Sequence, residues 1–236
     1  MASTVIKNWD NKTWLSSQIY ISSFNDFLIK NININSSSKI LDIGCGRGKI
    51  LGSLSSKLKL KEKPLGIDIV NHKDRDKRIN FKKRNILNIS LRKDQKFDLI
   101  LIKQTIHLMK LNQIKKLLKS LKKKLNSHGR ILIFTLDTAK NEIPTFKLMK
   151  LKLNQSLQRD KKILKIITNI YPHRIKKKFI FNVKITKKKY LEMIKNRYIS
   201  TLIPLSKTQL DQGIHEIQLR YKNVLKFKDK LICIIL

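Results

Sequence analysis

Three glycines and an acid form the part of the sequence best suited to chemistry. Gly44, Gly46 and Gly48 come directly after a short apolar run that ends at Ile43. Glycine lets a backbone turn sharply and approach a ligand that a Cβ atom would keep away. Asp42 lies near the end of the apolar run, at the edge where open α/β sheets hold their ligands. The spacing predicts a binding turn for a nucleotide-like cofactor.

The spacing of the glycines distinguishes two kinds of cofactor. A dinucleotide turn follows the pattern G-x-G-x-x-G, which needs glycine at position 49, and this chain has Lys49 there. The pattern present is D-x-G-x-G-x-G, which by itself is equally compatible with a simple tight turn. A second acid, Asp68, ends the next apolar run about 20 residues later, where a carboxylate can bind ribose hydroxyls. The acid therefore favours a cofactor that contains ribose.

Four segments in order resemble the class I S-adenosylmethionine (SAM)-dependent methyltransferases. The D-x-G-x-G-x-G turn is similar to the first motif of that family, and the run ending in Asp68 is similar to its second strand. Residues 97–107 resemble the fourth strand and its loop, and residues 121–134 resemble the passage from a helix to the fifth strand. The resemblance implies an enzyme that transfers a methyl group from SAM, its cofactor.

The resemblance also implies a set of cofactor-binding residues. They lie in the glycine turn and after the second, third and fourth predicted strands. The set is Asp42, Gly44, Cys45, Gly46, Gly48, Asp68, Ile69, Asn85, Ile86, Lys103 and Gln104. Asn85 can accept a hydrogen bond from an adenine amino group through its side-chain carbonyl. Cys45 and Cys233 make neither a disulfide framework nor a metal cluster, so no metal is expected.

His107, in the loop after the fourth predicted strand, is the candidate catalytic base. Methyl transfer is an in-line displacement, in which holding donor and acceptor at near-attack geometry is the main work. A base is needed only when the acceptor must lose a proton. A structural histidine that closes the loop is the alternative interpretation. The loop lacks both an Asn/Asp-Pro-Pro-aromatic tetrad and a cysteine, which argues against methylation of exocyclic base amines and of cytosine C5.

The acceptor is expected to lie among segments outside the core strands. The candidate residues are Tyr20, Arg197, Tyr198 and His215. An arginine there could pair with a carboxylate through two hydrogen bonds, although a structural ion pair is an equal alternative. Residues 190–198 and 211–216 resemble, more loosely, the tail of small-molecule methyltransferases of the trans-aconitate type. The predicted acceptor is a small molecule, with a carboxylate or a hydroxyl favoured.

The net charge of +37, from 53 basic and 16 acidic residues, has two interpretations. A basic surface gains affinity for a polyanion by releasing counterions from phosphates, which makes RNA methylation the alternative function. Compositional drift is the second interpretation, because 43 of the basic residues are lysines spread over the whole chain. Arginine and aromatic residues, which nucleic-acid sites mix into such patches, are sparse. Compositional drift is therefore the favoured explanation of the charge. A third candidate function is a protein that binds SAM without catalysing methyl transfer.

The order of elements predicts an α/β fold. The expected architecture is a Rossmann-like, seven-stranded, mostly parallel sheet with an antiparallel last strand, flanked by helices, with a helical lid inserted late in the chain. Strands are predicted at residues 39–43, 63–68, 79–83, 97–102, 131–135, 179–186 and 231–236. Helices are predicted at residues 13–30, 49–58, 111–125, 189–198 and 209–221, with one or two more between 146 and 171.

Two units are predicted along the chain. Residues 1–38 form an N-terminal helical cover, in which Tyr20 either faces the cofactor or packs on the sheet. Residues 39–236 form the SAM-binding domain, with substrate-lid insertions at about 139–178 and 187–227.

The link between the second and third predicted strands is unusually short. About eight residues separate these strands, where a parallel crossover normally takes a dozen or more. The helix expected there must therefore be rudimentary.

Location in the cell is predicted from two absences in the sequence. No apolar run of about 18 residues is present, so no transmembrane helix is expected. The N-terminal residues lack the apolar centre of a signal peptide. A cytoplasmic location is the expectation.

Overall fold

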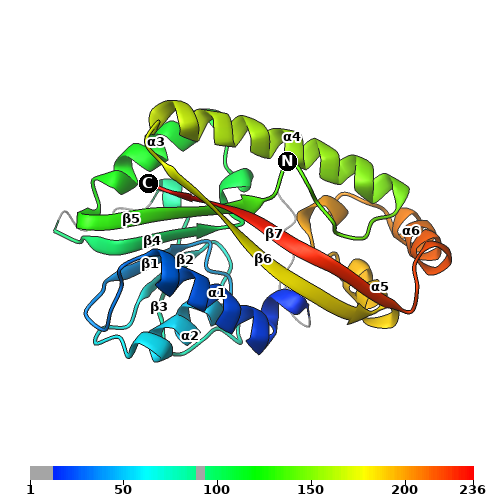
Figure 1. The fold of residues 1–236 in the computed structure, drawn as a ribbon, viewed down its shortest axis with the longest axis horizontal. Coiled ribbons are helices and arrows are strands. Elements are labelled where there is room, and N and C mark those ends of the chain that lie inside the picture. The colour runs from blue at the N-terminus through cyan, green and yellow to red at the C-terminus, as the bar shows by residue number, and fades with distance from the viewer. Residues whose placement is uncertain (1–12, 89–93) are drawn as a thin grey trace.

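The structure is a computed structural model that describes residues 13–88 and 94–236. The described residues form one seven-stranded sheet with the order β3-β2-β1-β4-β5-β7-β6 (Figure 1). Strands β1 to β5 pair in parallel, and β7 pairs antiparallel with both β5 and β6. The strands are β1 (Ile40–Ile43), β2 (Leu65–Asp68), β3 (Asn80–Lys83), β4 (Phe97–Lys103), β5 (Leu125–Leu136), β6 (Ile175–Thr186) and β7 (Val224–Ile235). The predicted fold class is confirmed, including the antiparallel strand inserted beside the fifth.

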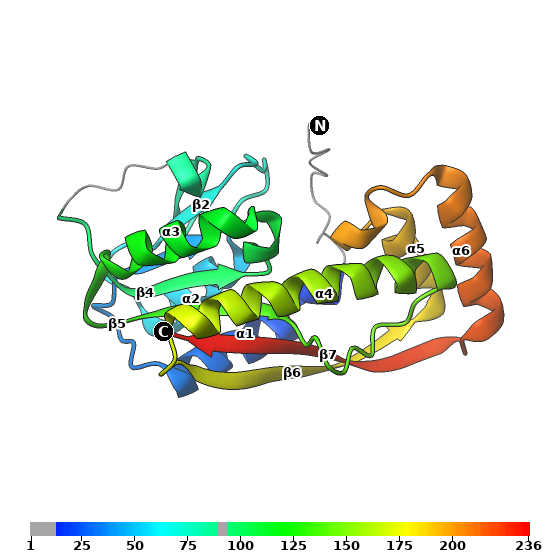
Figure 2. The ribbon, with the colours of Figure 1, turned by 90° about the horizontal axis from the view of Figure 1, so that it is seen from above.

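Helices cover both faces of the sheet. They are α1 (Gln18–Asn31), α2 (Lys49–Leu58), α3 (Leu111–Lys122), α4 (Lys147–Ile170), α5 (Lys187–Lys195) and α6 (Lys207–Arg220). Four 3₁₀ turns accompany them, η1 (Trp14–Ser16), η2 (Ile86–Asn88), η3 (Ile106–Leu108) and η4 (Ser200–Leu202). Helices α1 and α2 lie against one face, and α3 and α4 against the other (Figures 1 and 2). Two apolar cores result, one on each side of the sheet.

Three strands are longer than predicted, because tertiary pairing extends them. Strand β5 begins at Leu125, which pairs with Phe97 before an irregularity in the ladder. Strands β6 and β7 pair with each other from Ile175 to Thr186, past the end of β5. This β6–β7 arm carries α5 and α6 at its far end (Figure 1). Helix α4 is continuous over its 24 residues, so the segment between 146 and 171 forms one helix.

The short link between β2 and β3 contains no helix, whereas the sequence predicted a rudimentary one, and it bonds to the glycine turn. The backbone N–H of Asp76 donates to the carbonyl oxygen of Arg47 at 2.8 Å. A Cβ atom at Gly52 of α2 would lie 2.3 Å from Cγ of Asp76. Arg78 holds the Asp76 carboxylate with two bonds, at 2.9 and 2.6 Å. The link therefore packs directly on the first turns of α2.

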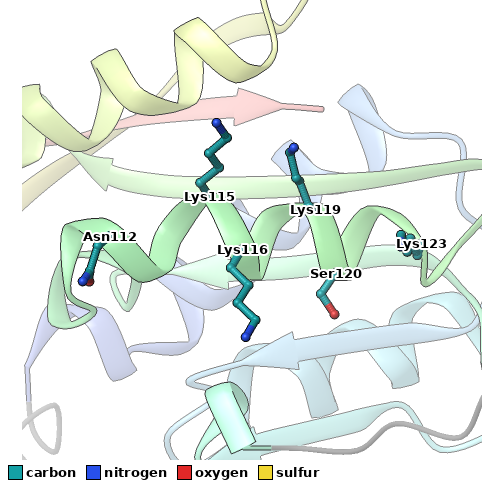
Figure 3. A pocket seen from close by; sticks show the side chains of 6 residues that line it. All are labelled: Asn112, Lys115, Lys116, Lys119, Ser120 and Lys123. Atoms are coloured by element: carbon teal, nitrogen blue, oxygen red, sulfur yellow. The ribbon is translucent and has the colours of Figure 1, made fainter.

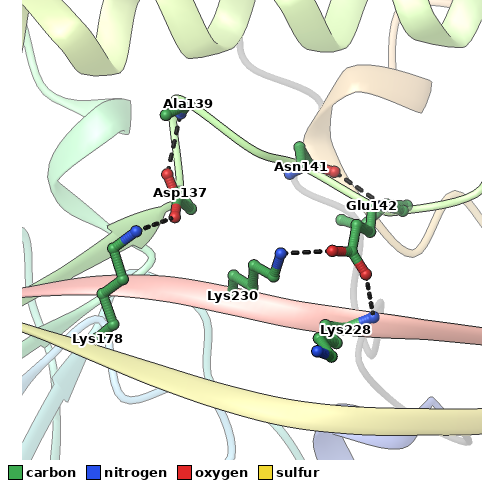
Figure 4. A network of polar contacts seen from close by, with 8 residues as sticks. Asp137, Ala139, Asn141, Glu142, Lys178, Lys228 and Lys230 are labelled. Atoms are coloured by element: carbon green, nitrogen blue, oxygen red, sulfur yellow. Dashed lines mark hydrogen bonds and ion pairs between the residues drawn. The ribbon is translucent and has the colours of Figure 1, made fainter.

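The segment between β5 and α4 is fastened to the β6–β7 arm by two acid–lysine pairs (Figure 4). Asp137, 1% exposed, accepts bonds from the N–H of Ala139 at 2.9 Å and from Nζ of Lys178 at 3.1 Å. Glu142 pairs with the side chain of Lys230 and accepts a bond from the backbone of the β7 residue Lys228. These bonds fix the start of the first predicted lid insertion against the sheet.

The first predicted lid insertion contains α4 and the beginning of β6. The second contains α5, η4, α6 and the beginning of β7. Within residues 13–88 and 94–236, no helix combines the length and apolar character needed to cross a membrane.

Candidate active site

The glycine turn joins the carboxyl end of β1 to α2 in a left-handed backbone conformation. Gly44, Gly46 and Gly48 have φ angles of 76°, 54° and 69°, which L side chains rarely adopt. A Cβ atom at Gly44 would lie 2.1 Å from Oγ1 of Thr105, in the loop after β4. A Cβ atom at Gly46 would meet no atom within 4 Å. The turn is therefore closed on its β4 side and open at Gly46, where a ligand can approach the backbone.

Asp42, just before the turn, is a buried acid with an unused acceptor. It is 5% exposed, and its Oδ1 atom has no hydrogen-bond partner. Burial raises the pKa of Asp42 from 3.8 to about 7, with the charge of Lys103 opposing the rise and the charge of Asp68 adding to it. A buried carboxylate oxygen without a donor is costly. A cationic donor on a bound ligand would satisfy it.

Asp68, at the end of β2, bonds to the glycine turn through its side chain. Its carboxylate accepts bonds from the N–H groups of Gly46 at 2.8 Å and Val70 at 2.9 Å. A carboxylate offers about four acceptor positions, so two ribose hydroxyls can still bind. Ile69 follows with 51% of its surface exposed, which gives an apolar surface at the place where the resemblance implies adenine. The sequence-predicted residues Asp42, Asp68, Ile69 and the three glycines therefore come together at one edge of the sheet.

Asn85 and Cys45 use part of their hydrogen-bonding capacity within the chain. The side-chain carbonyl of exposed Asn85 accepts the N–H of Leu87 at 3.0 Å and starts η2. The neighbouring Ile86 is half-buried. The backbone N–H of Cys45 donates to the carbonyl of Ile67 at 3.2 Å. Burial, together with the nearby charges of two acids, raises the pKa of the Cys45 thiol, which is therefore protonated.

Lys103, the last residue of β4, places its charge near two aromatic rings and two buried acids. Its Nζ atom lies 5.3 Å from the ring centroids of both Tyr20 and Phe24, a cation–π distance. Its charge also acts on the buried acids Asp42 and Asp229. Gln104 follows in a left-handed conformation, with φ of 54°. Such strain in a non-glycine residue is typical of loops held in place at functional sites.

A buried pair beside Lys103 was missed from the sequence. Nε1 of Trp14 donates to Oδ2 of Asp229 at 2.9 Å, across 215 positions of chain. Asp229 is 2% exposed. Burial raises its pKa, and the Trp14 bond and the Lys103 charge oppose that rise. This pair joins the N-terminal cover to β7. The available signal was an acid at an inward position of an apolar strand.

Two of the four acceptor candidates predicted from the sequence, Tyr20 and Tyr198, lie within reach of the charge of Asp229, which adds to the effect of burial in raising the pKa of each. Tyr20 is fully buried, with its ring against Phe179 and Phe181. Tyr198 is buried, and its hydroxyl lies 2.8 Å from that of Tyr190. Arg197 donates to three carbonyl oxygens of its own loop, those of Leu202, Ile203 and Leu205, at 2.6, 3.3 and 2.6 Å. His215 is exposed on α6. Their substrate role stays a prediction.

His107 lies in η3, on the loop that also contacts the glycine turn. Burial and the charge of Arg159 lower its pKa from 6.5 to about 4. The imidazole is therefore neutral near pH 7 and a weak proton acceptor. Arg159, from α4, donates to the backbone carbonyls of His107 at 3.0 Å and Met109 at 2.5 Å. Arg159, which the sequence did not single out, thus holds this loop under α4.

A separate surface hollow lies on the solvent side of α3 (Figure 3). Its lining residues are Asn112, Lys115, Lys116, Lys119, Ser120 and Lys123. The lysine side chains point away from the helix in several directions, so they form no convergent anion site. This hollow is built from one helix face and includes no residue of the glycine turn.

A known family matches this chain over more than half of its length. The model of a methyltransferase domain matches residues 34–197. The chain belongs to this methyltransferase domain family. With its strand order and its D-x-G-x-G-x-G turn, the protein is a class I SAM-dependent methyltransferase. A search of curated proteins gave no match.

Solved structures of methyltransferases and related proteins share the fold. The plantazolicin methyltransferase BpumL, in complex with a monoazolic desmethylPZN analog and SAH, is 19% identical with a TM-score of 0.52, covering 97% of this chain and 86% of that one. An Anabaena variabilis protein, assigned as a methyltransferase of an antibiotic biosynthesis pathway, is 14% identical with a TM-score of 0.60, covering 89% and 95%. A cyclopropane-fatty-acyl-phospholipid synthase-like protein from Lactobacillus casei is 15% identical with a TM-score of 0.58, covering 92% and 90%. At these identities the likeness concerns the fold.

Proposed function

We propose that this methyltransferase transfers a methyl group from SAM to a small-molecule acceptor held beyond the carboxyl ends of β4 and β5. The observation that carries the proposal is the unpartnered buried oxygen of Asp42 beside a glycine turn that is open at Gly46. An acid and a closely approachable backbone together fit a ligand with a cationic group and a nucleoside.

The residues present fit SAM, which supplies an electrophilic methyl group when it is bound. Asp42 would hold the ammonium group of its methionine part, and Lys103 its carboxylate. Asp68 would accept the ribose hydroxyls, and Ile69 would pack on the adenine ring. Asn85 and Ile86 stay predicted adenine neighbours. The protein would then hold donor and acceptor in line and exclude water. Such positioning can lower the activation free energy by several kcal/mol.

Acceptor choice is assigned to the parts of the chain around the core strands. These are the N-terminal cover, residues 1–38, and the lid insertions at about 139–178 and 187–227. The sequence favours a carboxylate or a hydroxyl as acceptor, and membership of the trans-aconitate-like branch stays a prediction, as does a cytoplasmic location. The BpumL complex contains a desmethylPZN analog, which supports an acceptor outside the nucleic acids without identifying it.

Calorimetric titration with SAH and with NADH tests the cofactor assignment. The wild type should bind SAH with a dissociation constant on the order of micromolar and should not bind NADH. Asp42→Asn, which keeps the shape of the side chain but removes its charge, should weaken SAH binding. Tight NADH binding, or SAH binding that Asp42→Asn leaves unchanged, would contradict the assignment.

RNA methylation is the second candidate, and the net charge of +37 is the observation that favours it. If the lysines are only a solvated surface, RNA binding should be weak, indifferent to sequence, and lost by about 0.2 M salt. Retention of one RNA at that salt, with discrimination against others, would promote this candidate. A protein that binds SAM without turnover is the third candidate, and it would show SAH binding without methyl transfer to any acceptor tested.

A further inference from the structure

Helix α4 carries one acid in its otherwise apolar buried stripe. The buried positions of α4 are Met149, Leu153, Leu157, Asp160, Ile163 and Ile167. Asp160 is 2% exposed, and its Oδ1 atom has no hydrogen-bond partner. Burying a carboxylate without donors is unfavourable, and a leucine at this position would complete the stripe. An acid at this position is therefore a candidate for binding a ligand.

The residue before Asp160 contacts the loop that follows β4. Arg159, the preceding residue, donates to the carbonyls of His107 and Met109 in that loop. Helix α4 also packs against η4, where Thr201 is 8% exposed and its hydroxyl has no hydrogen-bond partner. Figure 2 shows α4 running past the start of α3 towards α5 and α6. Two unpartnered buried polar groups thus lie on α4 and η4, which pack against each other, and α4 also packs on η3 in the loop after β4.

We propose that Asp160 and Thr201 bind the methyl acceptor, and that the acceptor presents an N–H or O–H group to Asp160. This inference rests on the proposed function and deepens it. An ionised carboxylate only accepts hydrogen bonds, so it binds an amine or a hydroxyl and repels another carboxylate. The sequence favours a carboxylate or a hydroxyl as the acceptor group. A site containing Asp160 favours a hydroxyl or an amine and excludes a carboxylate.

Asp160 is also placed to receive the acceptor's proton. As the carbon–sulfur bond breaks, its electron pair stays on sulfur, and the acceptor oxygen or nitrogen forms the new bond to the methyl carbon. The proton leaving that atom goes to the Asp160 carboxylate and then to water. Burial raises the pKa of Asp160 to about 6, with the charge of Arg159 opposing the rise. That value lies nearer to neutral pH than the value of about 4 for His107, which makes Asp160 the better proton acceptor.

Three small molecules that share a phenyl ring and differ in their polar group test this site. Benzylamine, benzyl alcohol and benzoate are titrated by NMR or calorimetry into the protein saturated with SAH. Benzylamine and benzyl alcohol should bind at least about tenfold more tightly than benzoate, because like charges placed together cost several kcal/mol. In Asp160→Asn the penalty against benzoate should fall to about threefold or less, since no carboxylate remains there to repel it.

Controls separate this inference from a loss of folding and from a failure of the proposed function. Asp211→Asn, an exposed acid on α6, should leave the ranking of the probes unchanged. SAH affinity and the melting temperature should be preserved in Asp160→Asn, because the change removes a buried charge. The wild-type ranking provides a test even if that variant does not fold.

The outcomes are distinct. Equal or tighter binding of benzoate, an unchanged ranking in Asp160→Asn, or no binding by any probe overturns the acceptor site. Absence of SAH binding by the wild type overturns the proposed function itself.

Discussion

The two sides of the sheet hold their polar groups in different ways. On the β1–β2 side, Asp42 lies just before the glycine turn in the chain. The turn bonds to the end of the next strand through the backbone of Ile67 and the carboxylate of Asp68. On the β6–β7 side, Trp14 bonds to Asp229 across 215 positions, and Asp160 and Thr201 lie on elements that meet only after folding. The geometry of the glycine turn is thus local in this protein, whereas the geometry of the proposed acceptor site is tertiary.

The same contrast is visible in the sizes of the two sides. The β2–β3 crossover contains no helix and packs a loop on α2, while the other side contains α4, α5, α6 and the β6–β7 arm. A cofactor site needs few groups at fixed positions, and a short loop can provide them. An acceptor site must enclose a molecule of its own shape, which requires additional elements.

The glycine turn should show the largest effect on the cofactor side. Gly44→Ala must place a side chain in the left-handed region, at about 1–2 kcal/mol, and against Thr105, at about 1–3 kcal/mol more. Gly46→Ala is the matched control, because it has a similar φ but open space around its Cβ. Thermal melting should show the larger loss of stability for Gly44→Ala. Equal losses would mean that contact with the β4 loop is unimportant.

Asp68→Ala comes next. It removes the acceptor for the Gly46 and Val70 N–H groups and for the proposed ribose hydroxyls. SAH affinity should fall by about ten- to hundredfold, as expected for charged hydrogen bonds of about 1.5–3 kcal/mol. Asp74→Ala, which removes a half-exposed partner of Arg47, is the control and should change affinity much less. Equal SAH binding by wild type and Asp68→Ala would remove Asp68 from the site.

Trp14→Phe changes the β6–β7 side of the sheet and leaves the β1–β2 side intact. The ring is retained, but Asp229 loses its donor, which should destabilise the fold by about 1–3 kcal/mol and lower the melting temperature. SAH affinity should stay near the wild-type value. Asp229→Asn keeps an acceptor oxygen and should cost less. A large loss of SAH binding in Trp14→Phe would show that the two sides are not independent.

Proton linkage at Asp42 should give a smaller effect. The folded protein keeps the Asp42 proton up to about pH 7, whereas an unfolded aspartate loses it near 3.8. This carboxyl therefore lowers stability as the pH rises through that window. A ligand ammonium favours the ionised form, so SAH binding should release a proton below pH 7 and strengthen up to about pH 8. Calorimetry in buffers of different ionisation enthalpy measures the release, and Asp42→Asn should abolish it.

The smallest effect is expected at His215, which is exposed on α6. His215→Ala should change stability by no more than about 0.5 kcal/mol and leave SAH affinity unchanged. Methyl transfer, once an acceptor is known, tests the substrate role predicted for His215 from the sequence. A fall in turnover with unchanged SAH affinity would support that role, and unchanged turnover would contradict it.

The core elements and the glycine turn could be predicted from the sequence because their determinants are local. Apolar runs with a period of two or of 3.6 residues define strands and helices, and glycine spacing defines the turn. Glycine permits the positive φ angles found at Gly44, Gly46 and Gly48, and their spacing after an apolar run predicts where the chain uses them. The short β2–β3 link could likewise be read from the distance between Asp68 and Ile79.

The partners of the long polar side chains were decided only by the tertiary structure. Arg197 was predicted at the acceptor site, but its guanidinium lies on the carbonyls of its own loop. Asp160 was not singled out, because an isolated acid in an amphipathic helix normally faces solvent. A hydrogen bond depends on which groups packing brings within about 3 Å, and residue order does not specify that for segments far apart in the chain. The sequence by itself therefore determined where the core strands and helices lie along the chain and where the glycine turn falls, while folding determined which buried polar groups were left without a partner.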